Sequence, residues 1–376
     1  MQLELAGIAP DMEIPEYLSD QLITYLGNKR TLINAIEEVV VGIRKELGGR
    51  RLRSADVFSG SGVVSRMLKK HSTHIATNDM ELYAAIISRA YLSNREEVPW
   101  EKLEEAVFRL NKKVLGGGGP KGFIAEMYAP QDDERIRRGE RVFYTSENAR
   151  RIDAFAQLIR KEDADIQELL LAPLLSSASV HANTGGVFKG FYKDDKGVGR
   201  FGGSGEDALS RIKRPIELRM PVLSKYSSKA EVYQLDAALL GKRLKKLDFV
   251  YLDPPYNQHP YGSNYFMLNL IADYKRPTKV SEVSGIPEDW QRSPYNKKQE
   301  SFKALSDLVA SLKARYVLLS FSDDGFLDPN DLERLFSQHG KSERFDIEYN
   351  TYRAARNLAG RDKKLTEHLF LLDRGE

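Results

Sequence analysis

Leu247-Asp248-Phe249-Val250-Tyr251-Leu252-Asp253-Pro254-Pro255-Tyr256 is the most informative segment of this 376-residue chain. Its first six residues are mostly apolar, which predicts a buried strand. The two prolines that follow fix two φ angles and remove two N–H donors, so the loop is rigid. The Asp253 side chain and the Pro254 carbonyl are then free to accept hydrogen bonds at the carboxyl end of a strand, where ligands bind in open α/β sheets.

Such a loop suits the activation of an aromatic amine. The lone pair of the amine is delocalised into its ring, and two acceptors, one for each N–H, push the nitrogen toward tetrahedral geometry. The amine can then attack a sulfonium methyl group in line, while Tyr256 offers a stacking face. A base in a duplex reaches such a pocket only by flipping out, at a cost of roughly a few kcal/mol, and stacking returns about 1–3 kcal/mol. We therefore predict a catalytic loop of Asp253, Pro254, Pro255 and Tyr256; the alternative is a simple turn capped by Asp253.

A glycine-rich turn lies upstream, between a predicted strand at 55–58 and a predicted helix at 63–70. Glycines let the backbone turn tightly and approach a ligand, and the helix N-terminus behind them favours an anionic group. An acid that follows the next strand, about 20 residues on, can bind ribose hydroxyls. The third glycine of a dinucleotide fingerprint is missing, which favours a smaller adenosine-bearing cofactor over NAD. The predicted cofactor-binding residues of this region are Asp56, Phe58, Ser59, Gly60, Gly62 and Asp79. The alternatives are a tight turn without a ligand and, for Asp79, a helix cap.

The order of the expected elements indicates an α/β fold with a largely parallel sheet. Strands and helices alternate near the N-terminus, with helices at 32–47, 63–70 and 81–92 and strands at 55–58 and 74–77. Further strands are expected at 247–252 and 316–321, with a closing pair at 345–352 and 367–372. The region between reads as mainly helical, including helices at 101–114 and two within 146–180. We therefore predict a catalytic domain of residues 1–100 and 229–376, with residues 101–228 as an inserted recognition domain.

The composition excludes several classes of chemistry. The chain has no cysteine, which rules out disulfides, Cys-ligated zinc and a thiolate nucleophile of the kind that methylates cytosine at carbon 5. No two of its six histidines have the spacing of metal ligands, so we expect no metal. No apolar run approaches the roughly 20 residues of a membrane span, and the N-terminus lacks the features of a secretory signal. We expect a cytoplasmic protein without a membrane partner, and the resemblance given below implies a prokaryotic protein that is associated with the nucleoid when it is bound to DNA.

Positive charge is concentrated in one glycine-rich region of a chain whose net charge is only +3. Residues 181–219 hold eight Lys or Arg against five Asp or Glu. Aromatic residues are interleaved with these charges at Phe188, Phe191, Tyr192 and Phe201, a combination that suits phosphates and unstacked bases. A second basic patch joins the two closing strands. The predicted nucleic-acid contacts are Lys189, Lys193, Arg200 and Arg211 in the first region, and Arg353 and Arg356 in the second. An ordinary solvated loop is the alternative.

Four segments together carry a resemblance to a known family. Asp253-Pro254-Pro255-Tyr256 matches the catalytic motif of the D12-class DNA adenine-N6 methyltransferases. Phe58-Ser59-Gly60-Ser61-Gly62 resembles their methionine-binding loop, and Tyr25-Leu26-Gly27-Asn28-Lys29 their opening motif. Residues 257–265 resemble the segment that follows the catalytic motif in type II modification enzymes of this class. The chain is thus similar to this family in pieces from about 25 to 372.

The resemblance implies a Rossmann-like methyltransferase fold, with a mostly parallel sheet, an antiparallel closing strand and a mainly helical inserted DNA-recognition domain. It implies S-adenosyl-L-methionine as cofactor, double-stranded DNA as substrate, and a possible cognate restriction endonuclease as partner. It also adds Tyr25, Gly27, Lys29, Asp236 and Asp253 to the cofactor site. Lys29 would pair with the methionyl carboxylate, and Asp236 would contact the adenine end. The alternatives are that Asp236 is a helix cap and that Tyr25 and Lys29 only begin the following helix.

Two other interpretations stay open from the residues. Methylation of cytosine at N4 uses the same amino activation, but usually with Ser in place of Asp253, and RNA or glutamine methylation more often with Asn. A catalytically silent DNA-binding subunit with the same fold is the interpretation from another class. The intact Asp253-Pro254-Pro255-Tyr256 and the intact glycine loop argue against it.

Overall fold

The computed structural model describes residues 13–203, 208–350 and 364–375. Their centre is a seven-stranded sheet in the order β3-β2-β1-β4-β5-β7-β6. The first five strands of that order run parallel, and β7 pairs antiparallel with both β5 and β6. The strands are β1 (Leu52–Asp56), β2 (Ser72–Asn78), β3 (Lys229–Tyr233), β4 (Leu247–Leu252), β5 (Ala314–Ser322), β6 (Lys341–Asn350) and β7 (Lys364–Asp373). The expected α/β fold, mostly parallel with an antiparallel closing pair, is confirmed.

Strand β4 shows why its sequence is apolar at almost every position. Its side chains alternate between the two faces of the sheet, and helices cover both faces, so Phe249 and Tyr251 are buried on one side and Val250 and Leu252 on the other. Asp248 is the exception, and it forms a two-point ion pair with Arg50 at 2.7 and 2.8 Å. The pattern at 247–252 therefore reflects a central parallel strand.

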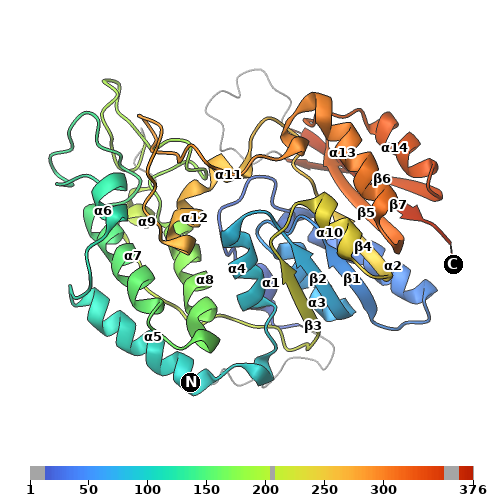
Figure 1. Cartoon of the computed structure of the whole chain (residues 1–376), viewed down its shortest axis with the longest axis horizontal. Helices are drawn as coiled ribbons and strands as arrows, with labels where there is room; N and C mark the ends of the chain where they lie inside the picture. Colours follow the sequence, from blue (N-terminus) through green and yellow to red (C-terminus); the bar gives the residue numbers. More distant parts are fainter. Residues whose placement is uncertain (1–12, 204–207, 351–363, 376) are drawn as a thin grey trace.

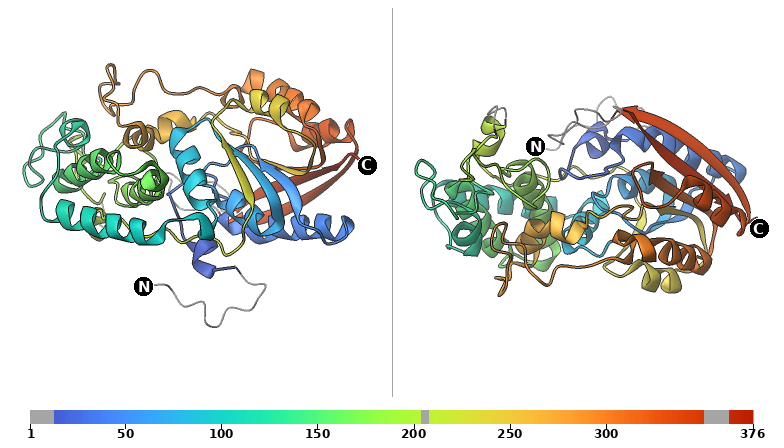
Figure 2. Two further views of the ribbon diagram at one scale, coloured as in Figure 1. Left: turned by 60° about the horizontal axis from the view of Figure 1, so that its bottom comes forward. Right: turned by 90° about the horizontal axis from the view of Figure 1, so that it is seen from above.

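Helices lie on both faces of the sheet, as the two views in Figure 2 show. One face is covered by α2 (Ile33–Glu46) and α3 (Val63–His71). The other is covered by α10 (Ala237–Arg243), α13 (Lys298–Ser311) and α14 (Pro329–Ser337). Strand β3 and these last three helices were not among the expected elements. Strand β3 is only half-buried, and the short helices α10 and α14 give a weak periodic signal, whereas α13 has 14 residues and was missed despite its length.

A helical lobe lies beside the sheet, on the left of Figure 1. Its helices are α5 (Trp100–Leu115), α6 (Phe123–Tyr128), α7 (Ser146–Ile159), α8 (Ala164–Val180) and α9 (Leu209–Lys213), together with α11 (Tyr261–Asn264) and α12 (Phe266–Asp273). The expected helix at 101–114 and the two within 146–180 are confirmed. One continuous hydrophobic core runs from α4 (Leu82–Tyr91), which flanks the sheet, through α5–α8 to α12. The lobe is thereby packed against α4 at the side of the sheet.

The remaining short helices connect these parts. They are α1 (Pro15–Ser19) and the 3₁₀ turns η1 (Arg30–Leu32), η2 (Arg95–Glu97) and η3 (Pro294–Asn296). In α1, the buried Tyr17 donates a hydrogen bond from its hydroxyl to the Tyr91 carbonyl at 2.9 Å. The N-terminal segment thus docks on α4.

Candidate active site

A cleft with an empty volume of about 790 Å³ opens at the carboxyl ends of β1, β2 and β4. Asp56 ends β1, Asp79 follows β2 and Asp253 follows β4, and all three line the cleft. Among the residues predicted from the sequence, the cleft is lined by Tyr25, Gly27, Lys29, Asp56, Phe58, Ser59, Gly60, Asp79, Asp253 and Pro255. Segments far apart in the chain therefore meet in one site.

The glycine loop needs its glycines for steric reasons. Gly60 and Gly62 have φ angles of 49° and 75°, a region that side chains disfavour, and a Cβ on Gly60 would lie 2.8 Å from the ring of Tyr25. The Gly60 N–H donates to Asp79 Oδ2 at 2.8 Å, and the Glu81 N–H donates to Asp79 Oδ1 at 2.9 Å. Asp79 therefore fixes the loop, while its contact with a ribose stays a prediction.

Asp56 is a buried carboxylate with one unused oxygen. Its Oδ2 accepts a hydrogen bond from the Ser65 hydroxyl at 2.6 Å, but its Oδ1 has no hydrogen-bond partner among the described residues. Burial raises the pKa of Asp56 to about 7. A buried acceptor without a partner is costly, so this oxygen is suited to a cationic donor of a ligand. The amino group of a methionine moiety has that chemistry.

Lys29 is held between two carboxylates. Its Nζ lies 2.9 Å from Asp253 Oδ1 and 3.1 Å from Glu367 Oε1, and it donates a hydrogen bond to the Gly27 carbonyl oxygen at 3.3 Å. Burial lowers the pKa of Lys29, but the two carboxylates outweigh burial and hold the pKa well above its ordinary value. In the structure Lys29 therefore pairs with Asp253 and Glu367, and its contact with a methionyl carboxylate stays a prediction.

Asp253 itself is mostly buried, with 18% of its side chain exposed. Burial raises its pKa to about 6; the Lys29 ammonium acts against this rise, and the Glu367 carboxylate adds to it. Asp253 Oδ2 and the Pro254 carbonyl accept no hydrogen bond from the described residues, so both acceptors of the catalytic loop are available.

Tyr256 lies beside this group rather than in the lining of the cleft. Its ring centroid is 5.6 Å from Lys29 Nζ and 5.6 Å from the ring of Phe321. Its carbonyl accepts a hydrogen bond from the Phe326 N–H at 2.8 Å. A Cβ on Gly27 would lie 3.0 Å from the Tyr256 hydroxyl, so Gly27 allows this close approach.

A stack of three tyrosines holds the opening motif over the cleft. The Tyr25 ring is parallel to Tyr261 and to Tyr265, with centroids 4.9 Å apart in both pairs. The Tyr261 hydroxyl donates to the Leu26 carbonyl at 3.2 Å, and the Tyr265 hydroxyl accepts from the Leu26 N–H at 2.7 Å. The segment after the catalytic loop thus positions the N-terminal motif.

Two buried acids of the site were not predicted from the sequence. Glu81 lines the cleft and accepts a hydrogen bond from the Asn269 side chain at 2.5 Å, and burial raises its pKa to about 8. Glu367 lies on β7 and is 1% exposed. Glu367 stands at the start of a strand whose next residues, 369–372, are apolar, and an acid in that position is a sign of a special role. Its partners lie in distant segments, so the sequence alone did not assign it to the site.

Asp236 stands at the edge of the site. Its Oδ1 accepts a hydrogen bond from the Ala238 N–H at 2.8 Å, so the helix-cap alternative is observed, at the start of α10. Its neighbour Ala237 lines the cleft. The contact of Asp236 with a cofactor stays a prediction.

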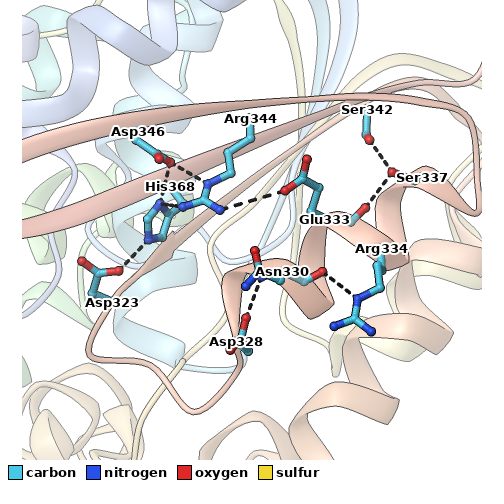
Figure 3. A network of polar contacts seen from close by, with 10 residues as sticks. All are labelled: Asp323, Asp328, Asn330, Glu333, Arg334, Ser337, Ser342, Arg344, Asp346 and His368. Atoms are coloured by element: carbon cyan, nitrogen blue, oxygen red, sulfur yellow. Dashed lines mark hydrogen bonds and ion pairs between the residues drawn. The ribbon is translucent and has the colours of Figure 1, made fainter.

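The closing strands brace the catalytic loop through the polar network in Figure 3. His368 on β7 lies between Asp346 and Asp323, with ring nitrogens 2.7 and 2.6 Å from their carboxylate oxygens. Asp323 also pairs through its backbone with Thr366 and begins the loop that contains Phe326. Because the Phe326 N–H binds the Tyr256 carbonyl, β6 and β7 support the loop that carries Tyr256.

The residues predicted to contact nucleic acid have different surroundings. Lys189 and Lys193 are exposed, and Lys193 Nζ lies 4.9 Å above the Phe191 ring. Arg200 is half-buried. Arg211 donates inward to the carbonyls of Val180 and Ala182, so its guanidinium holds the fold together, and its contact with nucleic acid stays a prediction.

Two of the aromatic residues interpreted as base-stacking groups are buried. Phe188 and Phe201 are only 2% and 9% exposed, and both belong to hydrophobic clusters, so their rings are not available to bases. Arg353 and Arg356 lie outside the described residues.

The described ranges contain no group of three or more His, Asp or Glu side chains arranged to hold a metal ion. Within them, no helix has both the length and the apolar character that crossing a membrane requires.

Comparison with known proteins shows which family the chain matches. Residues 25–332 match the family model of the D12 class of N6 adenine-specific DNA methyltransferases. The type II methyltransferase M.NlaIII of Neisseria lactamica is 29% identical over 363 residues, which cover 94% of this chain and 99% of that protein. The type II methyltransferase M.CviAII of Paramecium bursaria Chlorella virus 1 is 29% identical, covering 93% and 98%. The type II methyltransferase M.FokI of Planomicrobium okeanokoites is 25% identical, covering 93% of this chain but 52% of that protein. With the family model matched over most of its length, the chain belongs to the D12 class of N6 adenine-specific DNA methyltransferases.

Proposed function

We propose that the chain transfers the methyl group of S-adenosyl-L-methionine to the exocyclic N6 of adenine at a specific site in double-stranded DNA. We further propose that it is the modification enzyme of a restriction-modification system, with a cognate endonuclease as partner. The observation that carries the proposal is that one cleft is lined both by Asp253, the acid of the catalytic loop, and by Asp56, whose Oδ1 has no hydrogen-bond partner among the described residues. The family and the type II relatives support the same reaction.

The residues of the cleft fit the proposed cofactor. Asp56 Oδ1 would accept from its amino group, the glycine loop would pack closely against it, and Asp79 and Asp236 would stand toward its adenosine. When bound, S-adenosyl-L-methionine supplies an electrophilic methyl group on a positively charged sulfur. The positive charge of the cofactor would in turn favour the ionised form of the buried acids that line the cleft, such as Asp56.

The catalytic loop would activate the amine. Lys29 occupies Asp253 Oδ1, which leaves Oδ2 to accept one amino hydrogen while the Pro254 carbonyl accepts the other. The nitrogen must release a proton when its new bond to carbon forms. Asp253, with a pKa of about 6, is ionised at neutral pH and can take that proton before it passes to solvent.

The target adenine must leave the duplex to reach this loop. Unstacking costs roughly a few kcal/mol, which contacts in the pocket must return. Tyr256 is partly exposed beside Asp253 and is the candidate stacking partner. Lys189 and Lys193 on the helical lobe are candidates for contacts with the phosphate backbone.

Identification of the methylated nucleoside tests the proposal. The protein is incubated with methyl-labelled cofactor and with mixed DNA or RNA, and the digested product is separated. We expect labelled N6-methyladenine from duplex DNA, none from Asp253→Ala protein, and an unchanged yield from Asp331→Asn, which alters an exposed acid on α14. Labelled N4-methylcytosine, label only in RNA, or no label at all would refute the proposal.

A further inference from the structure

We propose that Glu367 is a positioning residue for the methyl transfer: by binding Lys29 it limits this lysine to one oxygen of Asp253 and leaves the other for the target amine. The inference rests on the proposed function and deepens it. Three parts of the chain contribute, since Lys29 precedes η1, Asp253 follows β4 and Glu367 lies on β7.

The geometry of Lys29 carries the first step. Lys29 Nζ forms ion pairs with Asp253 Oδ1 at 2.9 Å and with Glu367 Oε1 at 3.1 Å, and it donates a hydrogen bond to the Gly27 carbonyl at 3.3 Å. The two carboxylates therefore attract the same ammonium group from two sides. Without the negative charge of Glu367, the ammonium on its long, flexible stem would be attracted to Asp253 alone and would be free to shift onto Asp253 Oδ2, the acceptor that the amine needs.

Glu367 is itself fixed by the sheet. Its Oε1 accepts a hydrogen bond at 2.5 Å from the Ser320 hydroxyl on the neighbouring strand β5, and Ser320 is fully buried. Strand β7 is held between β5 and β6, so Glu367 has a rigid base. The position of a flexible lysine is thereby set by the closing strands.

The charge of the cluster supports a role beyond folding. Lys29 and Asp253 alone would form a neutral pair, and Glu367 adds a negative charge that is only 1% exposed. A buried charge is costly unless it serves a partner. Here the extra carboxylate acts on Asp253 in the direction opposite to Lys29: it raises the pKa of Asp253, whereas the lysine lowers it.

Three other acids line the cleft with Asp253, namely Asp56, Asp79 and Glu81. Burial raises the pKa of all three, to about 7 for Asp56 and about 8 for Glu81, and all three are unchanged in the variants compared below. Burial raises the pKa of three nearby phenols above the ordinary value, so they stay neutral in the acid range; these are Tyr251, Tyr256 and Tyr261. A change at Glu367 or Lys29 should therefore be visible in the acid limb of the rate profile.

Single-turnover rates of wild-type, Glu367→Gln, Glu367→Asp and Lys29→Met proteins between pH 5 and 8 test the inference. For Glu367→Gln we expect a single-turnover rate at pH 8 that is about 10–100-fold lower than that of wild type, with cofactor affinity within twofold of wild type. The acid limb of its pH–rate profile should lie at lower pH than in wild type. Lys29→Met should move the limb to higher pH. Glu367→Asp, which keeps the charge, should keep the wild-type limb. Glu343→Gln is the matched control on the exposed side of β6 and should behave as wild type.

The outcomes separate the two proposals. If wild-type protein makes no N6-methyladenine, the proposed function fails. If wild-type protein is active and Glu367→Gln has the wild-type rate and limb, only the positioning role is overturned. Thermal melting checks that each variant is folded. Should Glu367→Gln not fold, Ser320→Ala removes the hydrogen bond that holds Glu367 and leaves its charge in place, and an unchanged turnover rate in that variant would overturn the role.

Discussion

Gly60→Ala is expected to separate cofactor binding from folding. Gly60 has φ 49°, where a residue with a Cβ is strained by roughly 1–2 kcal/mol. The new Cβ would also lie 2.8 Å from Tyr25, about 0.6 Å inside the shortest ordinary contact of 3.4 Å. Tyr25 cannot retreat easily, because it is stacked on Tyr261 and Tyr265.

The clash must therefore move either Tyr25 or the glycine loop, both of which line the cleft. Overpacking of this kind costs about 1–3 kcal/mol. Since 1.4 kcal/mol corresponds to a factor of ten in affinity, we expect Gly60→Ala to weaken binding of S-adenosyl-L-methionine about 10–100-fold. Isothermal titration calorimetry measures the affinity, and thermal melting measures the stability of the same samples.

Gly117→Ala is the matched control. Gly117 has φ 82°, and a Cβ there would meet no atom within 4 Å, so the variant carries the backbone strain without the clash. Gly62→Ala is intermediate, with φ 75° and an ordinary contact of 3.7 Å to Ile87. We expect Gly117→Ala to lose about 1–2 kcal/mol of stability at unchanged cofactor affinity. Equal affinity in Gly60→Ala and wild type, or equal weakening in Gly117→Ala, would refute the steric explanation.

Two further predictions concern charge. Burial raises the pKa of Asp56 from an ordinary value of 3.8 to about 7, so the ionised carboxylate is unfavourable in the folded, unliganded protein. The free energy of unfolding should therefore fall as the pH rises from about 4 through 7. Asp56→Asn should therefore melt at a higher temperature than wild type at pH 8, and the difference in melting temperature should be smaller at pH 5. The same variant should bind the cofactor more weakly. A difference in melting temperature that does not change with pH would contradict this explanation. For DNA, Lys189→Ala should reduce the slope of log affinity against log salt by about 0.9 for each phosphate that the variant no longer neutralises. Arg211→Ala should instead lower the melting temperature and leave the salt slope unchanged, because its guanidinium binds backbone carbonyls. Fluorescence anisotropy of labelled DNA at several salt concentrations measures the slope for both variants. A wild-type slope in Lys189→Ala would exclude a contact between Lys189 and a phosphate.

The sequence predicted those parts of the site that local rules govern. The apolar run 247–252, the two prolines after it and the glycines at 60 and 62 each constrain their own backbone, so their conformations follow from the residues themselves. Strand β3 was missed because it is half-buried at the edge of the sheet, where no alternation marks it.

What the sequence determined by itself was therefore the α/β class with its mostly parallel sheet, the position of the cleft at the strand ends, and most of the acidic and glycine residues that line it. Only the tertiary structure decided the partners: that Lys29 serves Asp253 and Glu367, that Arg211 turns inward, and that Phe188 and Phe201 are buried. The physical reason is that backbone preference is a local property, whereas burial and hydrogen-bond partners depend on which distant segments the sheet brings together. Asp253 and Glu367 reach Lys29 only because β4 and β7 both pair with β5.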